Sequence, residues 1–309
     1  MIEPAVIILR LLQYVGAMIL LGSSLFYLRA LPRSGAGSAE QTPWARRLLA
    51  GGAALLAISA LLWIAGQASL LAGSVAEGLR PATLLAVVTG FDLGKAAVVR
   101  AATAGLAVIL VVSLKPARAA WLAGVLLGLV ATASFAWMGH GAATEGALGP
   151  VHLASDIVHS WAAAAWIGAL VAFLLLLMAR TRTAESTAVL HRALHGFSGL
   201  GTLLVIALVL TGLVNSAILV GLQTLDGLWT TPYGRLLSLK VVFFAGMLAL
   251  AAKNRYRLTP ALGRALVTPA TQGAAIAALR RSVVVETGLG LGVLALVAWF
   301  GTLAPPSVH

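Results

Sequence analysis

Three ionisable side chains interrupt an apolar run that otherwise has the length and composition of a membrane-spanning helix. The run covers residues 151–178 and contains His152, Asp156 and His159. At about 100° per residue, these three positions fall within an arc of about 60° on one helix face. An ionisable residue is costly inside a membrane and indicates a function involving a partner. Two imidazoles and a carboxylate on one stripe are a plausible ligand set for a transition metal, with Asp156 as a ligand or as the acceptor for an imidazole N–H.

Further candidate ligands lie at the end of the preceding apolar run. His140 directly follows residues 119–139, and Met138 precedes it by two positions. Because a short connection joins the two runs, the helices should be antiparallel neighbours, and His140, His152 and His159 could converge at one membrane surface. Imidazole together with thioether sulfur suits copper, and thioether favours Cu(I). A second interpretation stays open, in which the histidines are hydrogen-bonded polar residues and the methionine fills the core.

Other polar or soft side chains could line a path through the membrane. Met18 is a further thioether in the first apolar run, and Asn215 lies in the sixth. Asn215 could form an interhelical hydrogen bond or line a pore. Glu286 lies about one turn inside the last run, where it could pair with Lys253 or an arginine, or act as an exit ligand or proton acceptor.

Two basic residues stand at the start of the third apolar run. Lys95 and Arg100 are expected to be interface anchors whose charged ends reach the membrane surface. Arg100 could instead pair with Asp156.

The composition indicates an integral membrane protein. Hydrophobic residues make up 60% of the 309 positions, charged residues make up 10%, and the mean hydropathy is +0.99. A soluble domain carries about 25% charged residues. There is no cysteine, which excludes disulfides and thiolate metal sites. The net charge of +12 comes from basic residues that lie mostly in short connections between apolar runs. We therefore expect membrane lipid and not nucleic acid as the partner.

The pattern predicts an all-α bundle of about eight transmembrane helices in a single membrane domain that covers residues 1–309. Each segment is long enough for a bilayer, which needs about 20 residues. The segments are 4–28, 47–70, 95–114, 119–139, 151–178, 197–222, 235–252 and 283–303. Residues 81–91 could be a re-entrant or interfacial piece before the third segment.

The distribution of basic residues predicts the orientation. Of the 21 lysines and arginines, 15 lie in the connections after the first, third, fifth and seventh segments or at the segment residue next to them. Cytoplasmic loops carry such an excess. Both termini are therefore expected to be extracytoplasmic, in the periplasm or outside the cell if the protein is bacterial.

Several motifs resemble the copper resistance protein D (CopD) family, in the family's order. They are GPVHLASDIVHSWAAAAWIGAL (149–170), HGFSGLG (195–201), LTGLVNSAIL (210–219), TPYGRLLSLKVVFFAGMLALAAKNRYRLTP (231–260) and RRSVVVETGLGLGVLALVAWFGTLAPP (280–306). The resemblance covers a core of about residues 149–306. It implies a multi-pass protein of the bacterial inner membrane that contributes to copper resistance and homeostasis. It also implies copper movement from periplasm to cytoplasm, with a periplasmic copper-carrier protein as donor.

On this interpretation the protein is not an enzyme, and its metal is a copper ion, Cu(I) or Cu(II). External copper would be captured by His140, His152 and His159, with help from Met138 and Asp156, and would then move toward the other end of the bundle. Two alternatives remain. One is a haem- or copper-dependent membrane redox protein, with His140 and His159 as conceivable axial ligands of a haem. The other is a copper sensor or assembly partner that does not transport.

Overall fold

The computed structural model describes residues 2–31, 43–139, 142, 144, 146–178, 184–221 and 224–306. Throughout this part of the chain the regular structure is helical, and no strand occurs. Eight of its helices are long and apolar enough to cross a membrane. These spans are Glu3–Ala30, Trp44–Leu71, Asp92–Ser113, Arg118–Trp137, Gly146–Leu177, Glu185–Val220, Pro232–Ala265 and Ala270–Phe300. The predicted all-α class and the predicted number of transmembrane helices are confirmed.

Short helical pieces extend or interrupt several spans. The first span combines α1, a π-helical turn and α2, and the seventh combines α11, a second π-helical turn and α12. The elements are α1 (Ile2–Met18), the π turn Ile19–Ser23, α2 (Ser24–Ala30), α3 (Pro43–Leu71), α4 (Val75–Gly78), α5 (Pro81–Gly90), α6 (Asp92–Ser113), α7 (Arg118–Ala133), the 3-10 turns Ser134–Trp137 and Gly146–Leu148, α8 (Gly149–Leu177), α9 (Ala184–Val220), α10 (Gly227–Thr230), α11 (Pro232–Lys253), the π turn Asn254–Leu258, α12 (Thr259–Ala265) and α13 (Pro269–Phe300).

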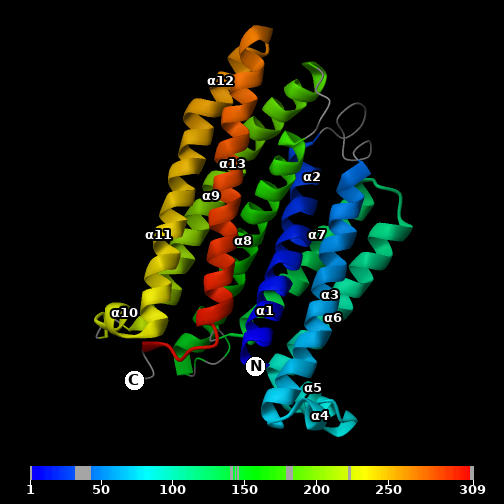
Figure 1. Ribbon diagram of the computed structural model, residues 1–309, viewed down its shortest axis with the longest axis vertical. Coiled ribbons are helices and arrows are strands. Elements are labelled where there is room, and N and C mark those ends of the chain that lie inside the picture. The colour runs from blue at the N-terminus through cyan, green and yellow to red at the C-terminus, as the bar shows by residue number, and fades with distance from the viewer. Residues whose placement is uncertain are drawn as a thin grey trace.

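The long helices run side by side along the long axis of the molecule (Figure 1). Both chain ends lie at the same end of the bundle, and α12 lies at the opposite end. Eight membrane crossings, an even number, place both chain ends on the same side of the membrane. Which end faces the cytoplasm stays a prediction from the basic residues.

Residues 81–90 form a short apolar helix, α5, which begins with Pro81 at its first position and packs against α3 and α6. Proline suits this position because the first N–H of a helix has no intrahelical acceptor. The apolar segment therefore lies against the ends of α3 and α6, at the end of the bundle that holds the chain termini (Figure 1).

The last three spans are longer than hydropathy predicted. α9 begins at Ala184 and not at 197, and α13 begins at Pro269 and not at 283. The added turns contain alanine, leucine and arginine, which favour helix whether or not lipid surrounds them. Hydropathy therefore finds the apolar part of each helix and misses its extension. As a result Glu286 lies near the middle of α13, and its expected position one turn from the helix start was wrong.

The helix α8 carries His152, Asp156 and His159 on one face, which we call the stripe. Two glycines bring α8 into close contact with the first span. A Cβ atom placed on Gly22 would lie 2.0 Å from the carbonyl oxygen of Ala164, and one placed on Gly168 would lie 2.2 Å from that of Met18. The hydroxyl of Ser23 also donates to the carbonyl of Gly168 over 3.1 Å. α8 additionally contacts α7, α9 and α13, so it lies at the centre of the bundle with neighbours on most sides.

Candidate metal site

The stripe on α8 faces a cavity of about 400 Å³ in the half of the bundle that holds the chain ends. We call it the proximal cavity. Residues from α8, α9, α11 and α13 line most of it, and α1 closes one side. His152, Asp156 and His159 all line this one cavity, as the helical spacing of the three positions requires.

His159 is held in one orientation by α9. Its Nδ1 lies 2.8 Å from the hydroxyl oxygen of Thr211, and that hydroxyl donates its single proton to the carbonyl of Ala207 over 2.6 Å. The imidazole must then donate through Nδ1–H, which leaves Nε2 with a free lone pair. Gly212 leaves room for the ring, because a Cβ there would lie 3.7 Å from the His159 Cε1. This hydrogen bond selects the tautomer that a metal-binding histidine needs at Nε2.

Asp156 lies one helical turn from His159 and is joined to α9 through Asn215. The Asn215 Nδ2 donates to the Asp156 Oδ1 over 3.3 Å, so the expected interhelical hydrogen bond of Asn215 is present. The Asn215 Oδ1 is buried and has no hydrogen-bond partner among the described residues. Both side chains line the proximal cavity, where they offer it oxygen atoms.

His152 lies at the start of α8 and is 1% exposed. Its Nδ1 lies 2.6 Å from the hydroxyl oxygen of Thr144, in the segment that connects α7 and α8. His140, the third histidine of the expected cluster, lies outside the described residues. His152 and His159 are seven residues apart on one helix, which corresponds to about 10 Å of rise.

Within the described part of the chain, no group of three or more His, Cys, Asp or Glu side chains is arranged to hold a metal ion. The proximal cavity therefore offers nitrogen and oxygen donors spread along its length, and not a closed cage. Such an arrangement suits an ion that exchanges between ligands, because conduction requires sites that also release.

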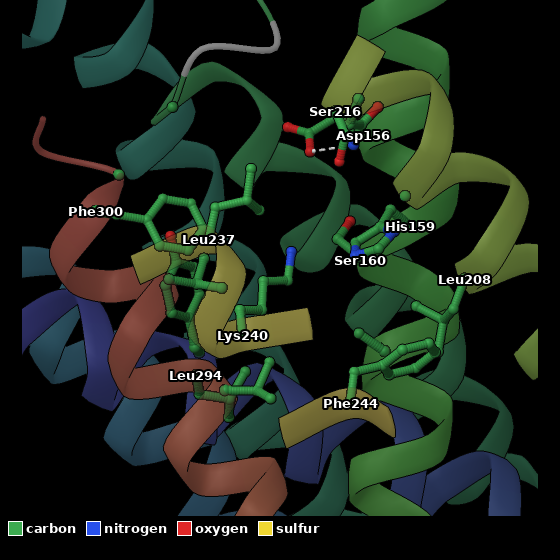
Figure 2. A pocket seen from close by; sticks show the side chains of 18 of the residues that line it. Asp156, His159, Ser160, Leu208, Ser216, Leu237, Lys240, Phe244, Leu294 and Phe300 are labelled. Carbon is green, nitrogen blue, oxygen red and sulfur yellow. Dashed lines mark hydrogen bonds between the residues drawn. The ribbon is translucent and has the colours of Figure 1, made fainter. Parts of the chain in front are cut away.

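Lys240 also lines the proximal cavity, and it was not among the functional residues expected from the sequence. It projects from α11 toward the face of α8 that carries Asp156 and His159 (Figure 2). Its Nζ lies 5.7 Å from the ring centroid of Phe300, and Asp156 lines the same cavity. The signal was available in the sequence, because a lysine eight residues into an apolar helix is costly in a membrane.

The two methionines of the expected path lie in different environments. Met18 lines the proximal cavity. Met138 is 7% exposed and is not among the residues that line the cavity, and its Sδ accepts a hydrogen bond from the Arg100 Nη1 over 3.3 Å. The sulfur of Met138 therefore faces a guanidinium group in this structure.

Arg100 is fully buried, so its expected role as a snorkelling interface anchor was wrong. Its guanidinium donates to the side chain of Gln13 and to the side chain and carbonyl of Ser134, and it stacks 4.3 Å from the ring centroid of Phe135. Arg100 makes these contacts, and the alternative expectation of an ion pair between Arg100 and Asp156 was also wrong. Because each guanidinium nitrogen has an acceptor inside the bundle, the arginine does not have to reach the surface.

Glu286 also differs from expectation, because its carboxylate is not held by a basic residue. Its Oε1 accepts from the Trp166 Nε1 over 3.0 Å, and its Oε2 accepts from the Asn254 Nδ2 over 2.8 Å. The ion pairs in the described part of the chain are Arg80–Glu77 and Lys95–Asp92, both on the surface. A charged partner was expected because Glu286 follows Arg280 and Arg281 near the start of an apolar run, whereas the residue lies in the bundle interior.

Comparison with known proteins covers nearly the whole chain. Residues 1–150 match the family described as copper resistance protein D-like, N-terminal domain, and residues 191–300 match the family described as copper resistance protein D. The chain is 37% identical over 307 residues to copper resistance protein D of Pseudomonas syringae pv. tomato, across 98% of this chain and 97% of that protein. It is 33% identical over 139 residues to the inner membrane protein YebZ of Escherichia coli (strain K12), across 44% of this chain and 46% of that protein. No solved structure matches. The chain belongs to the copper resistance protein D family and is a multi-pass protein of the inner membrane.

Proposed function

We propose that this member of the copper resistance protein D family moves copper ions across the inner membrane, from periplasm to cytoplasm, and that the proximal cavity receives them. The observation that carries the proposal is the set of three ionisable side chains on α8 that line one cavity inside the membrane bundle. Burying such groups is costly, so their common position calls for a ligand.

The donor chemistry of the cavity supports copper as the cargo. His159 offers an imidazole nitrogen in the tautomer that binds metals, and Met18 adds a thioether to the same cavity. Imidazole suits copper in either oxidation state, and thioether favours Cu(I). Asp156 supplies a negative charge that offsets part of the charge of an entering cation.

Lys240 supports transit over permanent storage. A lysine ammonium in the same cavity repels a copper cation and lowers the affinity that the histidines and Asp156 would otherwise give. A transport site must bind firmly enough to capture the ion and weakly enough to release it. The opposing charges of Asp156 and Lys240 meet both needs.

The proposed direction rests on the distribution of basic residues. Arg10, Phe300 and Gly301, which lie near the two chain ends in the sequence, line the proximal cavity. Both chain ends lie at one end of the bundle (Figure 1), so the cavity lies in the half toward that end. The positive-inside rule predicts that this end is periplasmic. Copper would then enter beside His152 from a periplasmic carrier protein and move toward the opposite end of the bundle.

Uptake of copper by proteoliposomes tests the proposal. Vesicles that contain the wild-type protein should accumulate externally added Cu(I) faster than protein-free vesicles, and His159→Ala should remove most of that difference. His191→Ala is the matched control, since this histidine of α9 lines neither the proximal cavity nor the second cavity described below. Copper binding without uptake would refute transport and support a sensor or assembly role. An intense haem absorption band in the purified protein would support the redox alternative.

A further inference from the structure

A second cavity of about 350 Å³ lies in the half of the bundle away from the chain ends. We call it the distal cavity. α8, α9, α11, the π turn Asn254–Leu258 and α13 supply its walls. Glu286, Asn254 and His195 are among its polar lining residues.

The carboxylate of Glu286 is the most costly group on this cavity. The residue is 1% exposed, and the hydrogen bonds to its two oxygens come from uncharged donors, the Trp166 indole and the Asn254 amide. A buried carboxylate without a compensating positive charge is unfavourable. No lysine, arginine or histidine of the described residues lies within ion-pair distance of it.

Trp166 separates the two cavities. Among the described residues, it is the one that lines both the proximal and the distal cavity. Its ring packs edge-on against Phe244 of α11, with the ring centroids 6.0 Å apart. The Trp166 indole, packed against Phe244, therefore lies between the cavity that His159 lines and the cavity that Glu286 lines.

The Trp166 indole, which lies between the two cavities, is also a hydrogen-bond donor to the Glu286 carboxylate. Its Nε1–H donates to the Glu286 Oε1, so a rotation of the indole away from the path would break this hydrogen bond. The movement that opens the partition would at the same time free a carboxylate oxygen on the far side. Rotation of the Trp166 indole would thus both connect the two cavities and make the Glu286 oxygen available as a ligand.

Asn254 provides a second oxygen at this place. It lies in the π turn that follows α11, and its Oδ1 is buried without a hydrogen-bond partner among the described residues. Turning the amide by 180° about its last torsion would point this oxygen toward Glu286. Such π turns are frequent at functional sites.

We propose that Glu286 and Asn254 form a transient second station for the transported copper ion, and that the Trp166 indole is the partition through which the ion reaches it. This inference rests on the transport function proposed above. A carboxylate oxygen and an amide oxygen bind copper weakly in comparison with histidine or methionine. The station therefore passes the ion on and does not retain it.

Glu286→Gln tests the station. The variant should fold, because the Asn254 amide can turn so that its Oδ1, which has no partner among the described residues, accepts from the new NH₂ group. Copper binding at the proximal cavity should keep its affinity, whereas uptake into proteoliposomes should fall by about tenfold or more. At saturating Cu(I), the purified variant should also bind one weakly held copper ion fewer than the wild type.

Uptake by Glu286→Gln within about twofold of the wild type, per folded molecule, would overturn the station while leaving the proposed function intact. A wild type that binds copper but transports none would overturn the proposed function. In that case the copper stoichiometry decides the station, because equal stoichiometry in wild type and Glu286→Gln would refute it.

Trp166→Phe tests the partition. The variant keeps an aromatic ring but loses the N–H that holds it on Glu286, so preloaded vesicles should lose copper faster than wild-type vesicles. Trp161→Phe is the matched control on the same helix, because the Trp161 Nε1 donates to the carbonyl of Leu129 and the residue lines neither cavity. Equal leak rates in the two variants would refute the role of Trp166.

Discussion

Replacing Thr211 with valine should weaken copper binding without touching any candidate ligand. Thr211 accepts the Nδ1–H of His159 because its own proton is donated to the carbonyl of Ala207. Valine keeps the shape of the side chain and removes the acceptor. The imidazole of His159 is then free to carry its proton on Nε2, where a metal needs a lone pair.

The expected loss follows from the role of Thr211 as the partner of a ligand. Removing a partner of this kind typically costs about 10–100-fold in metal affinity, which corresponds to about 1.4–2.8 kcal/mol. The cost to folding should be smaller, about 1 kcal/mol, because the helix retains its backbone hydrogen bonds. Affinity should therefore change more than stability.

Competition titration with a Cu(I) chelator measures the affinity, and thermal unfolding in detergent measures the stability. Thr103→Val is the matched control, since Thr103 on α6 makes the same hydrogen bond to a carbonyl four residues earlier and contacts no histidine. Equal copper affinity in Thr211→Val and the wild type would refute the assignment of His159 as a ligand through Nε2.

Three further outcomes are expected. Lys240→Leu removes a positive charge from the proximal cavity without adding a copper ligand and should raise copper affinity by about tenfold in the same titration, since like charges on one cavity repel by about 1–2 kcal/mol; unchanged affinity would place the copper ion away from Lys240. Gly168→Ala puts a Cβ atom 2.2 Å from a backbone oxygen of the first span and should lower stability by about 1–3 kcal/mol, measured as a lower thermal midpoint. Gly105→Ala, where a Cβ meets nothing within 4 Å, should not lower it. A reporter that is active only in the cytoplasm should give no signal when it is fused to the C-terminal end, and a strong signal there would reverse the predicted orientation and the proposed direction of transport.

The sequence was sufficient to predict the number of spans and the face of α8 that carries the stripe. Both depend on local periodicity, because hydropathy marks each apolar run and a spacing of three or four residues places side chains on one helix face. His152, Asp156 and His159 are separated by four and three residues, so any helix through them must align them. The interhelical hydrogen bond of Asn215 was also among the expectations.

Partners between helices could not be predicted in the same way. The environment of Arg100 depends on Gln13 and Ser134, which are 87 and 34 residues away in the chain. The donors to Glu286 lie on α8 and on the π turn after α11, and no local pattern links those segments. Both charges were therefore expected near the membrane surface, whereas tertiary packing buries them with uncharged partners.

Close helix contacts were hidden for a related reason. The chain contains 33 glycines, and the sequence does not distinguish Gly22 and Gly168, which meet at a helix crossing, from Gly105, which faces open space. Only the crossing point of two helices decides which glycine must lack a side chain.

X-ray absorption at the copper edge shows directly whether the histidines of α8 bind copper, when it is measured on the wild type and on His152→Ala and His159→Ala at equal copper loading. We expect imidazole scattering in the wild type and the loss of one nitrogen ligand in His159→Ala, together with weaker binding. An unchanged spectrum and full copper occupancy in both variants would contradict it, because the copper ion would then lie away from the stripe on α8.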